Sequence, residues 1–414
     1  KKYLLFLIFS PLIFFANFIY YFYPFKFCEI NASRLGAATV WAEGFLFSKK
    51  YFSYEELNNC KIFFYFRQPI KNNQIHIMIE RSFHIYKPAL FFFVIEKVLR
   101  LWNKNKFTLD FKNYSLKNTK LQSKINKIYK KPILFFLKNE ILEAKELLNK
   151  IGIQKNDKWV CIHNRDSVYL DYEYPKKNWS FHTNRDFSVE SLLSAAELFA
   201  QNGYYVLRMG KRQKHKLISK NSKIIDYSFS EIRCDLMDIY LLANCEFYFG
   251  GESGPSDISY TFCRPCYGIN FPPTYFYESR AHLDSSFIFK RIKNLKNNQL
   301  LSLKNIFKNK NGQRLNNINM SDFDYNKANQ EHLKFIDNSE EDIRAFADEI
   351  LRERMGEKIE SDEDSINQKK FWKIYYNFNK GLFDNNLKQY VQLDKSIKPK
   401  VSPSFIRNNL DLLN

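Results

Sequence analysis

Phe249-Gly-Gly-Glu-Ser-Gly-Pro255 is the most informative stretch of this sequence. An apolar run ends at its first residues and predicts a strand, whereas the proline suits the first turn of a following helix. Glycines allow backbone amides to approach a ligand closely, and the first amides of a helix lack partners within the helix. The turn therefore predicts an anion-binding pocket that involves Glu252, Ser253 and Gly254; a tight turn without any ligand is the alternative.

Strands and helices alternate on both sides of this turn. The predicted strands cover residues 159–163, 204–208, 223–226, 246–250 and 266–271, and the predicted helices cover residues 188–201, 235–243 and 255–263. Because the strands are continuous apolar runs separated by helices, they predict an α/β domain with a doubly wound parallel sheet, which we place at residues 151–300. Residues 301–414 lack this alternation and predict a helical and irregular C-terminal extension, with one clear helix at 338–354.

Polar residues follow the ends of several predicted strands. The candidates for binding phosphate groups are Arg165, Arg185, Arg208 and Gly210, and the candidates for binding a nucleoside are Asp226, Tyr227 and Ser228. The carboxyl ends of parallel strands meet at one edge of a sheet, where arginine can bind a diphosphate through two hydrogen bonds. His163, at the end of the first of these strands, is a candidate catalytic residue. Ion pairs between arginine and aspartate at a domain seam, and simple helix capping, are the alternatives.

A second α/β region precedes this domain at residues 25–150. Its predicted strands cover residues 27–30 and 61–66, and its predicted helices cover residues 37–47, 90–100 and 139–151. Arg34 and Gly36 lie between the first strand and the first helix, and they are further candidates for phosphate binding. Glu43, about two turns into that helix, is a candidate general base; an ordinary exposed acid is the alternative.

Residues 3–23 are almost wholly apolar, and Lys1 and Lys2 precede them. A run of this length is long enough to cross a bilayer, but Pro11 favours a shallow insertion over a straight span. The lysines and arginines that follow suit the anionic cytoplasmic leaflet. We therefore predict a membrane-associated apolar helix over residues 1–24; a buried core helix is the alternative.

The composition limits the possible classes of protein. The 414 residues are 45% hydrophobic and 26% charged, which excludes global disorder, and a mean hydropathy of −0.44 excludes a protein with several membrane spans. The formal net charge of +20 favours an anionic partner, although an AT-rich coding bias toward lysine also explains the excess. The seven cysteines form no regular framework, and the pair Cys263 and Cys266 predicts neither a metal site nor redox chemistry.

Taken together, these motifs resemble a family of bacterial glycosyltransferases associated with surface polysaccharide. The matching segments are residues 33–36, 162–166, 182–185, 208–210, 226–228, 235–238, 250–255 and 337–343. Ser253-Gly-Pro255 is also similar to the donor loop of heptosyltransferases, and His163-Asn-Arg165 is similar to a strand end of fucosyltransferases. Ala37 stands where a histidine is expected, so this chain uses another base or has a different role if that histidine is the base in relatives.

The resemblance implies the GT-B fold, in which two Rossmann-like domains face each other across a cleft. It implies transfer of a sugar from a nucleotide-sugar donor to a glycan or lipid-linked acceptor, without a metal or other cofactor, with the diphosphate held by arginines and helix-start amides. The expected location is the cytoplasmic face of the bacterial inner membrane, with the membrane surface as a partner and no nucleic acid. The alternatives are a pyruvyl or phosphoglyceryl transferase on the same scaffold, an inactive sugar-binding module, and a basic nucleic-acid-binding protein.

Overall fold

The computed structural model describes most of the chain in two units. The described residues are 2–30, 33–52, 54–67, 71–116, 125, 128–176, 178–273, 285–307, 332–379, 383–384, 389–390 and 399–414. The first unit consists of Lys1–Asn118 and Lys131–Lys138, and the second consists of Thr119–Lys130 and Asn139–Asn414. The helix α7 (Lys138–Lys150) therefore begins at the unit boundary, which lies near residue 138 rather than at the predicted residue 150.

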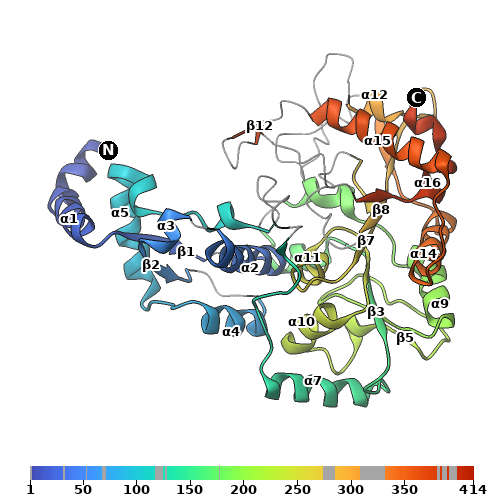
Figure 1. The fold of residues 1–414 in the computed structure, drawn as a ribbon, viewed down its shortest axis with the longest axis horizontal. Helices are drawn as coiled ribbons and strands as arrows, with labels where there is room; N and C mark the ends of the chain where they lie inside the picture. Colours follow the sequence, from blue (N-terminus) through green and yellow to red (C-terminus); the bar gives the residue numbers. More distant parts are fainter. Residues whose placement is uncertain are drawn as a thin grey trace. The chain divides into compact units, whose positions relative to one another are not determined.

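A seven-stranded parallel sheet lies at the centre of the second unit (Figure 1). Its strands are β3 (Trp159–His163), β4 (Tyr205–Arg208), β5 (Ile224–Ile225), β6 (Tyr248–Gly250), β7 (Cys266–Phe271), β8 (Ser286–Phe289) and β14 (Lys400–Val401). Their spatial order is β14-β8-β7-β6-β3-β4-β5, so the chain runs from β3 outward to β5 and then returns to the other side of β3. The predicted doubly wound sheet is confirmed, and the strand order reverses between β3 and β6.

Helices with one apolar face cover this sheet. They are α9 (Leu193–Gln201), α10 (Asp235–Asn244), α11 (Gly254–Thr261), α14 (Glu340–Arg354), α15 (Asp362–Asn379) and α16 (Pro403–Arg407). The predicted helix α14 begins at Ser339, whose hydroxyl accepts a hydrogen bond from the backbone N–H of Asp342 (3.1 Å). Its residues Ile343 and Phe346 are completely buried in one core with α9 and with Phe249 of the sheet, and α9 and α14 lie side by side in Figure 1.

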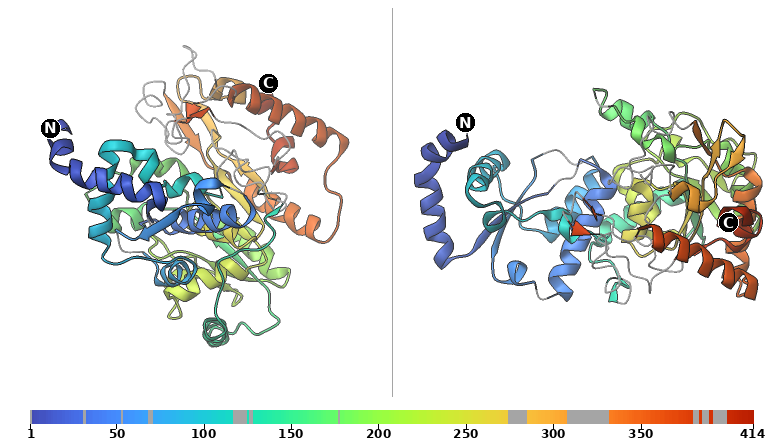
Figure 2. Two further views of the ribbon diagram at one scale, coloured as in Figure 1. Left: turned by 60° about the vertical axis from the view of Figure 1, so that its left-hand side comes forward. Right: turned by 90° about the horizontal axis from the view of Figure 1, so that it is seen from above.

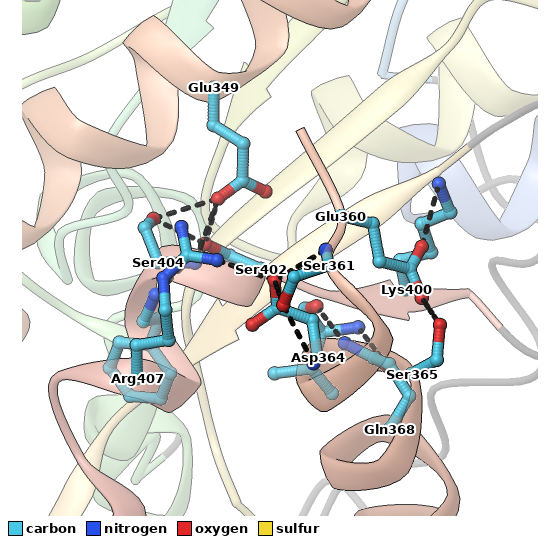
Figure 3. A network of polar contacts seen from close by, with 12 residues as sticks. Glu349, Glu360, Ser361, Asp364, Ser365, Gln368, Lys400, Ser402, Ser404 and Arg407 are labelled. Carbon is cyan, nitrogen blue, oxygen red and sulfur yellow. Dashed lines mark hydrogen bonds and ion pairs between the residues drawn. The ribbon is translucent and has the colours of Figure 1, made fainter. Parts of the chain in front are cut away.

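The end of the chain belongs to this unit, which corrects the prediction of a separate extension over residues 301–414. The strand β14 pairs with β8 at the edge of the sheet, and Phe405 lies in the shared core. A polar network holds this segment to α14 and α15 (Figure 3). Within it, the Glu349 carboxylate accepts hydrogen bonds from the hydroxyl groups of Ser402 (2.8 Å) and Ser404 (2.7 Å). Most of residues 399–406 are buried, but β14 pairs with a strand that lies far away in the sequence, so no local pattern predicts this relationship.

Short elements complete the second unit. The strands are β9 (Arg291–Asn294), β10 (Gln299–Leu300), β11 (Leu333–Ile336), β12 (Phe383–Asp384) and β13 (Gln389–Tyr390). The helices are α8 (Val168–Glu173), α12 (Leu303–Phe307) and the 3-10 helices η2 (Ser180–Arg185), η3 (Glu190–Leu192), η4 (Tyr227–Phe229) and η6 (Leu410–Leu413). The strands form two small antiparallel sheets, one in the order β10-β9-β11 and one from β12 and β13.

The first unit contains a smaller parallel sheet, a reduced form of the predicted Rossmann-like domain. The strand β1 (Phe25–Glu29) pairs with β2 (Lys61–Tyr65), and single bridges from Phe27 to Thr108 and from Phe64 to Ile85 extend this sheet on both sides. The helices are α1 (Lys2–Phe22), α2 (Leu35–Tyr51), α3 (Glu55–Asn58), α4 (Asn73–Ser82), α5 (Ala89–Phe107) and the 3-10 helix η1 (Phe111–Tyr114). Aromatic rings fill its core.

Helix α1 is present as predicted and lies beside α5 in Figures 1 and 2. Ile13 and Ala16 of α1 are buried in one apolar cluster with Val98 and Leu99 of α5. Among the described residues, no helix is both long and apolar enough to cross a membrane. The shallow membrane association expected for this segment stays a prediction.

Candidate functional site

Strands β3 and β6 flank the point where the strand order reverses. His163 at the end of β3 is the register partner of Gly250 at the end of β6. A Cβ atom at position 250 would lie 2.3 Å from the carbonyl oxygen of His163, so only glycine allows the two strands to approach this closely. Doubly wound sheets bind their ligands outside the carboxyl ends of the strands at such a switch point. The residues predicted at the ends of β3 and β6 therefore share the expected position for a ligand.

Hydroxyl groups hold the turn between β6 and α11 in place. The Tyr248 hydroxyl donates to the carbonyl oxygen of Gly251 (2.7 Å). The Ser256 hydroxyl accepts from the backbone N–H of Ser253 (3.1 Å) and donates to the carbonyl oxygen of Ser253 (2.7 Å). Ser253 and Gly254 stay partly exposed at the start of α11. The positive end of the helix dipole is thus open to an anion at these two residues.

Two ion pairs connect the end of β3, the short helix η2 and the turn after β6. Arg165, which follows β3, pairs with Asp186, and Arg185 pairs with Glu252 of the turn. Lys290, which follows β8, donates a hydrogen bond to the carbonyl oxygen of Asp186 (2.6 Å). We refer to these five residues as the arginine–acid cluster. It gathers three cationic side chains at the edge of the sheet where β3 and β6 end.

The arginine–acid cluster is largely buried. Arg165, Glu252 and Lys290 expose only 8%, 6% and 2% of their surfaces. Burial lowers the pKa of the Lys290 ammonium, and the charge of Asp337, whose oxygen lies 2.6 Å away, opposes this effect. The Nε atom of Arg185 is buried and has no hydrogen-bond partner among the described residues. A buried N–H group without a hydrogen-bond partner lowers the stability of the fold. Binding of a ligand whose oxygen accepts a hydrogen bond from this N–H group would therefore be favoured.

Arg208 lies at the same edge of the sheet but is part of the interior. Its side chain is 0% exposed and donates to Asn164 (3.0 Å), Gln213 (2.8 Å) and Asp226 (3.3 Å). Burial lowers the pKa of Arg208, and the Asp226 carboxylate opposes this effect. All three nitrogens are engaged, because Nε also donates to Asn164 (3.2 Å). Arg208 therefore joins the ends of β3, β4 and β5, and the structure gives no support to its predicted contact with a phosphate.

The predicted nucleoside-binding residues are also used within the fold. Asp226 accepts hydrogen bonds from Arg208 and from a backbone N–H (2.7 Å). Tyr227 is completely buried and donates its hydroxyl proton to Asp238 (2.8 Å), while the Ser228 hydroxyl donates to the carbonyl oxygen of Arg208 (3.4 Å). Burial raises the pKa of Asp238 to about 6. These partners do not support contact between the three residues and a nucleoside.

His163 is almost completely buried. Its Nδ1 atom lies 2.8 Å from the carbonyl oxygen of Met209, and this nitrogen carries the proton because a carbonyl can only accept. Burial lowers the pKa of His163 to about 3, with a smaller contribution from the charges of Arg208 and Arg165. The imidazole is thus neutral at physiological pH. A group with so low a pKa is a poor general base, so the geometry favours a buried hydrogen-bond donor to Met209 over the predicted catalytic residue.

Three predicted site residues lie in the first unit. Arg34 is exposed immediately before α2, and Gly36 is buried in the first turn of that helix. Glu43 is completely buried, and its carboxylate accepts hydrogen bonds from the backbone N–H groups of Ile133 (2.5 Å) and Leu134 (2.8 Å). Glu43 therefore attaches the segment 131–138 to α2. This burial contradicts the alternative of an exposed acid and does not support a general base.

Sequence reasoning missed several residues of this edge. They are Asn164, Asp186, Gln213 and Lys290. Asn164 and Asp186 stand next to predicted residues, and the polarity of Asn164 beside the end of β3 was a usable signal. Lys290 offered no signal, because the strand that precedes it was not predicted. The predicted phosphate binding by Gly210 stays a prediction, and its φ of +149° gives this glycine a structural reason.

The structure adds two facts about metal and thiol chemistry. Among the described residues, no group of three histidine, cysteine, aspartate or glutamate side chains could hold a metal ion. All seven cysteines, including Cys263 and Cys266, are free. Transfer without a metal or other cofactor stays a prediction.

Comparisons with protein-family models and with curated protein sequences find no match. Among solved structures, the glycosyl transferase family 9 protein from Veillonella parvula is 10% identical, with a TM-score of 0.36 over 64% of this chain and 86% of its own. The ADP-heptose LPS heptosyltransferase II of E. coli is 11% identical, with a TM-score of 0.34 over 64% of this chain and 90% of its own. Similarity at this level carries no conclusion about activity, so the chemistry has to be argued from the residues of this chain.

Proposed function

We propose that this chain transfers a sugar from a nucleotide-activated donor to a glycan or lipid-linked acceptor. One observation carries the proposal: the arginine–acid cluster and the open start of α11 meet where the strand order reverses between β3 and β6. A switch point with clustered cations and a glycine turn suits a nucleotide diphosphate. The sequence motifs that resemble surface-polysaccharide glycosyltransferases support a growing surface glycan as the acceptor.

In this proposal, the donor diphosphate replaces the carboxylates that now pair with the two arginines. Asp186 binds Arg165 and Glu252 binds Arg185, so each guanidinium already occupies a geometry that binds an oxyanion. Phosphate oxygens match the same fork of N–H donors. The partly exposed amides near Ser253 supply further donors to the same group.

The proposed reaction joins the acceptor hydroxyl oxygen to the anomeric carbon of the donor and breaks the bond from that carbon to the diphosphate. The leaving diphosphate gains negative charge, which Arg165, Arg185 and the start of α11 stabilise. This arrangement supplies positive charge from side chains, so we propose transfer without a bound metal. The hydroxyl proton passes to a base other than His163, whose pKa of about 3 is too low for the task.

A thermal-shift screen with UDP-, GDP-, ADP-, CDP- and dTDP-sugars tests this proposal. A ligand that binds only the folded state raises the melting temperature, and we expect one nucleotide to raise it by about 5 °C at saturating concentration. The variants Arg185→Gln and Ser253→Ala should lose at least half of this shift, because they remove a donor to the diphosphate.

Arg344→Gln is the matched control, because Arg344 lies on the surface of α14 and donates only to the carbonyl oxygen of Ser194 (3.1 Å) among the described residues. It should keep the full nucleotide shift. The proposal fails if none of the five nucleotides changes the melting temperature. It also fails if Arg185→Gln binds the nucleotide as strongly as the unchanged chain does.

A further inference from the structure

Helix α1 exposes large apolar side chains on the face opposite its core contacts. The exposed residues are Ile8, Leu12, Phe14, Phe15, Phe18, Tyr21 and Phe22. Phe14 exposes 77% of its surface and Phe18 exposes 58%, whereas Ile13 and Ala16 are buried against the core. A helix that is apolar on both faces needs a second apolar environment, because exposed patches of this kind mark interaction sites.

Helix α5 also exposes large apolar side chains. Leu90, Phe91, Val94 and Trp102 expose 70%, 57%, 49% and 55% of their surfaces. The two helices pack side by side in both orientations of Figure 2 and contribute to one apolar cluster. Together, these exposed residues of α1 and α5 form a surface that we call the apolar face.

Three cations lie over aromatic rings of α1 and α5, and one of them, Arg67, also pairs with Glu29 (3.4 Å). Lys106 lies 4.6 Å from the ring centre of Tyr20, and Arg67 and Lys97 lie 4.6 Å and 5.2 Å from the ring centre of Phe93. Their charged groups therefore lie over aromatic rings, whose faces attract a cation.

Exposed acids are missing from both helices. The sequence of α1 contains no aspartate or glutamate, and the only acid of α5 is Glu96. Glu96 is 3% exposed and accepts hydrogen bonds from the Tyr65 hydroxyl and from Arg100 (3.3 Å). An anionic partner would thus meet cations and no carboxylate on these two helices.

We propose that the apolar face docks on the surface of a bilayer that contains anionic lipids, with α1 lying in the interface rather than crossing it. Apolar side chains would enter the boundary between headgroups and acyl chains, aromatic rings such as Trp102 would sit at that boundary, and the lysines would contact anionic headgroups. The cations favour an anionic bilayer over a second copy of the chain, because contact between two copies would bring their cations close together. The inference does not depend on the proposed transferase activity.

Vesicle co-sedimentation of the full chain tests the inference. We expect binding to vesicles of phosphatidylcholine with about 30% phosphatidylglycerol, and weaker binding when the salt concentration rises or the anionic lipid is left out. The triple variant Phe14→Gln, Phe18→Gln, Phe91→Gln should bind at least about tenfold more weakly, because it removes three rings from the apolar face. The control Ile218→Gln, Ile366→Gln changes residues of the second unit that are equally exposed (79% and 63%) and should bind normally.

Quenching of tryptophan fluorescence by brominated lipid gives a second, direct readout. The unchanged chain should be quenched by vesicles, and Trp102→Phe should lose most of this quenching because Trp102 lies on the apolar face. Thermal melts establish that every variant is folded. The inference is overturned if the folded chain does not bind anionic vesicles, or if the triple variant binds as well as the unchanged chain. It is also overturned if light scattering shows a dimer that the triple variant dissociates while vesicles remain unbound.

Discussion

His163 and Arg208 show how polar side chains are stabilised away from water at the carboxyl edge of the sheet. The imidazole donates to the carbonyl oxygen of Met209, and the guanidinium engages all three of its nitrogens. Burial disfavours the charged form of each group, so the pKa of each is lowered. Changes at these two residues should therefore affect stability as well as any ligand.

The low pKa of His163 predicts a specific dependence of stability on pH. The folded chain binds the proton only near pH 3, whereas the unfolded chain binds it near the ordinary value of 6.5. The free energy of unfolding should therefore fall as the pH falls from 6.5 toward 3, by up to about 1.4 kcal/mol per pH unit from this residue. His163→Gln should have a shallower profile in denaturant titrations between pH 6.5 and pH 4.5. Parallel profiles for the two proteins would contradict this pKa.

Gly210 gives a prediction about close packing. A Cβ atom at this position would lie 2.2 Å from Nε2 of Gln213 and 2.8 Å from the Ser228 hydroxyl oxygen, so Gly210→Ala should displace Gln213 from Arg208. We expect a loss of about 2–3 kcal/mol in the free energy of unfolding, measured by chemical denaturation. Gly203→Ala is the control, because Gly203 has a φ of +91° but open space around it. It should cost only about 1 kcal/mol, and equal losses in both variants would show that the close contact is unimportant.

At the scale of elements, the attachment of β14 and α16 to α14 depends on one carboxylate. Glu349 is buried and accepts hydrogen bonds from two hydroxyl groups and from the backbone N–H of Ser404 (3.0 Å). Glu349→Ala leaves these donors without a partner and should lower the free energy of unfolding by about 3 kcal/mol. Glu353→Ala, one turn later on α14, removes only a half-exposed ion pair to Lys400 and should cost at most about 1 kcal/mol. Similar denaturation midpoints for the two variants would contradict this role of Glu349.

The local sequence pattern was sufficient to predict several strands of the large sheet. The runs around β3, β6 and β7 are apolar and end in polar or glycine residues, and each was predicted within two residues of its observed bounds. β8 and β14 were missed because their pairing depends on parts of the chain that lie far apart in the sequence.

The candidate site, too, was predictable from the sequence only in part. Its position at the strand ends followed from the parallel sheet, so the convergence of His163, Arg165 and the turn after β6 was predictable. The pairing of Arg185 with Glu252, and the burial of Arg208, depend on distances between segments that the sequence does not contain. Polarity alone therefore identified the right edge of the sheet, while only the structure separates residues that face a ligand from residues that hold the strands together.

At the scale of the whole molecule, each unit has an apolar core of its own. The core of the second unit joins the sheet to the C-terminal helices, and α1, β1 and α5 share a separate cluster in the first unit. The candidate donor site lies in the second unit, and the apolar face lies in the first. Ligand binding and membrane docking should therefore be separable by variants that leave the other unit unchanged.

Calorimetry of the full chain tests this separation. We expect two unfolding transitions, because each core is cooperative by itself. Glu43→Gln weakens the two backbone contacts of its carboxylate in the first unit and should lower only one transition, whereas Gly210→Ala should lower only the other. A nucleotide-sugar that binds should raise the transition that Gly210→Ala lowers and leave the other in place, because stabilisation by a ligand acts on the unit that holds its site. A single transition moved by both variants would show one cooperative body, and a ligand shift in the transition of Glu43→Gln would place the donor site in the first unit.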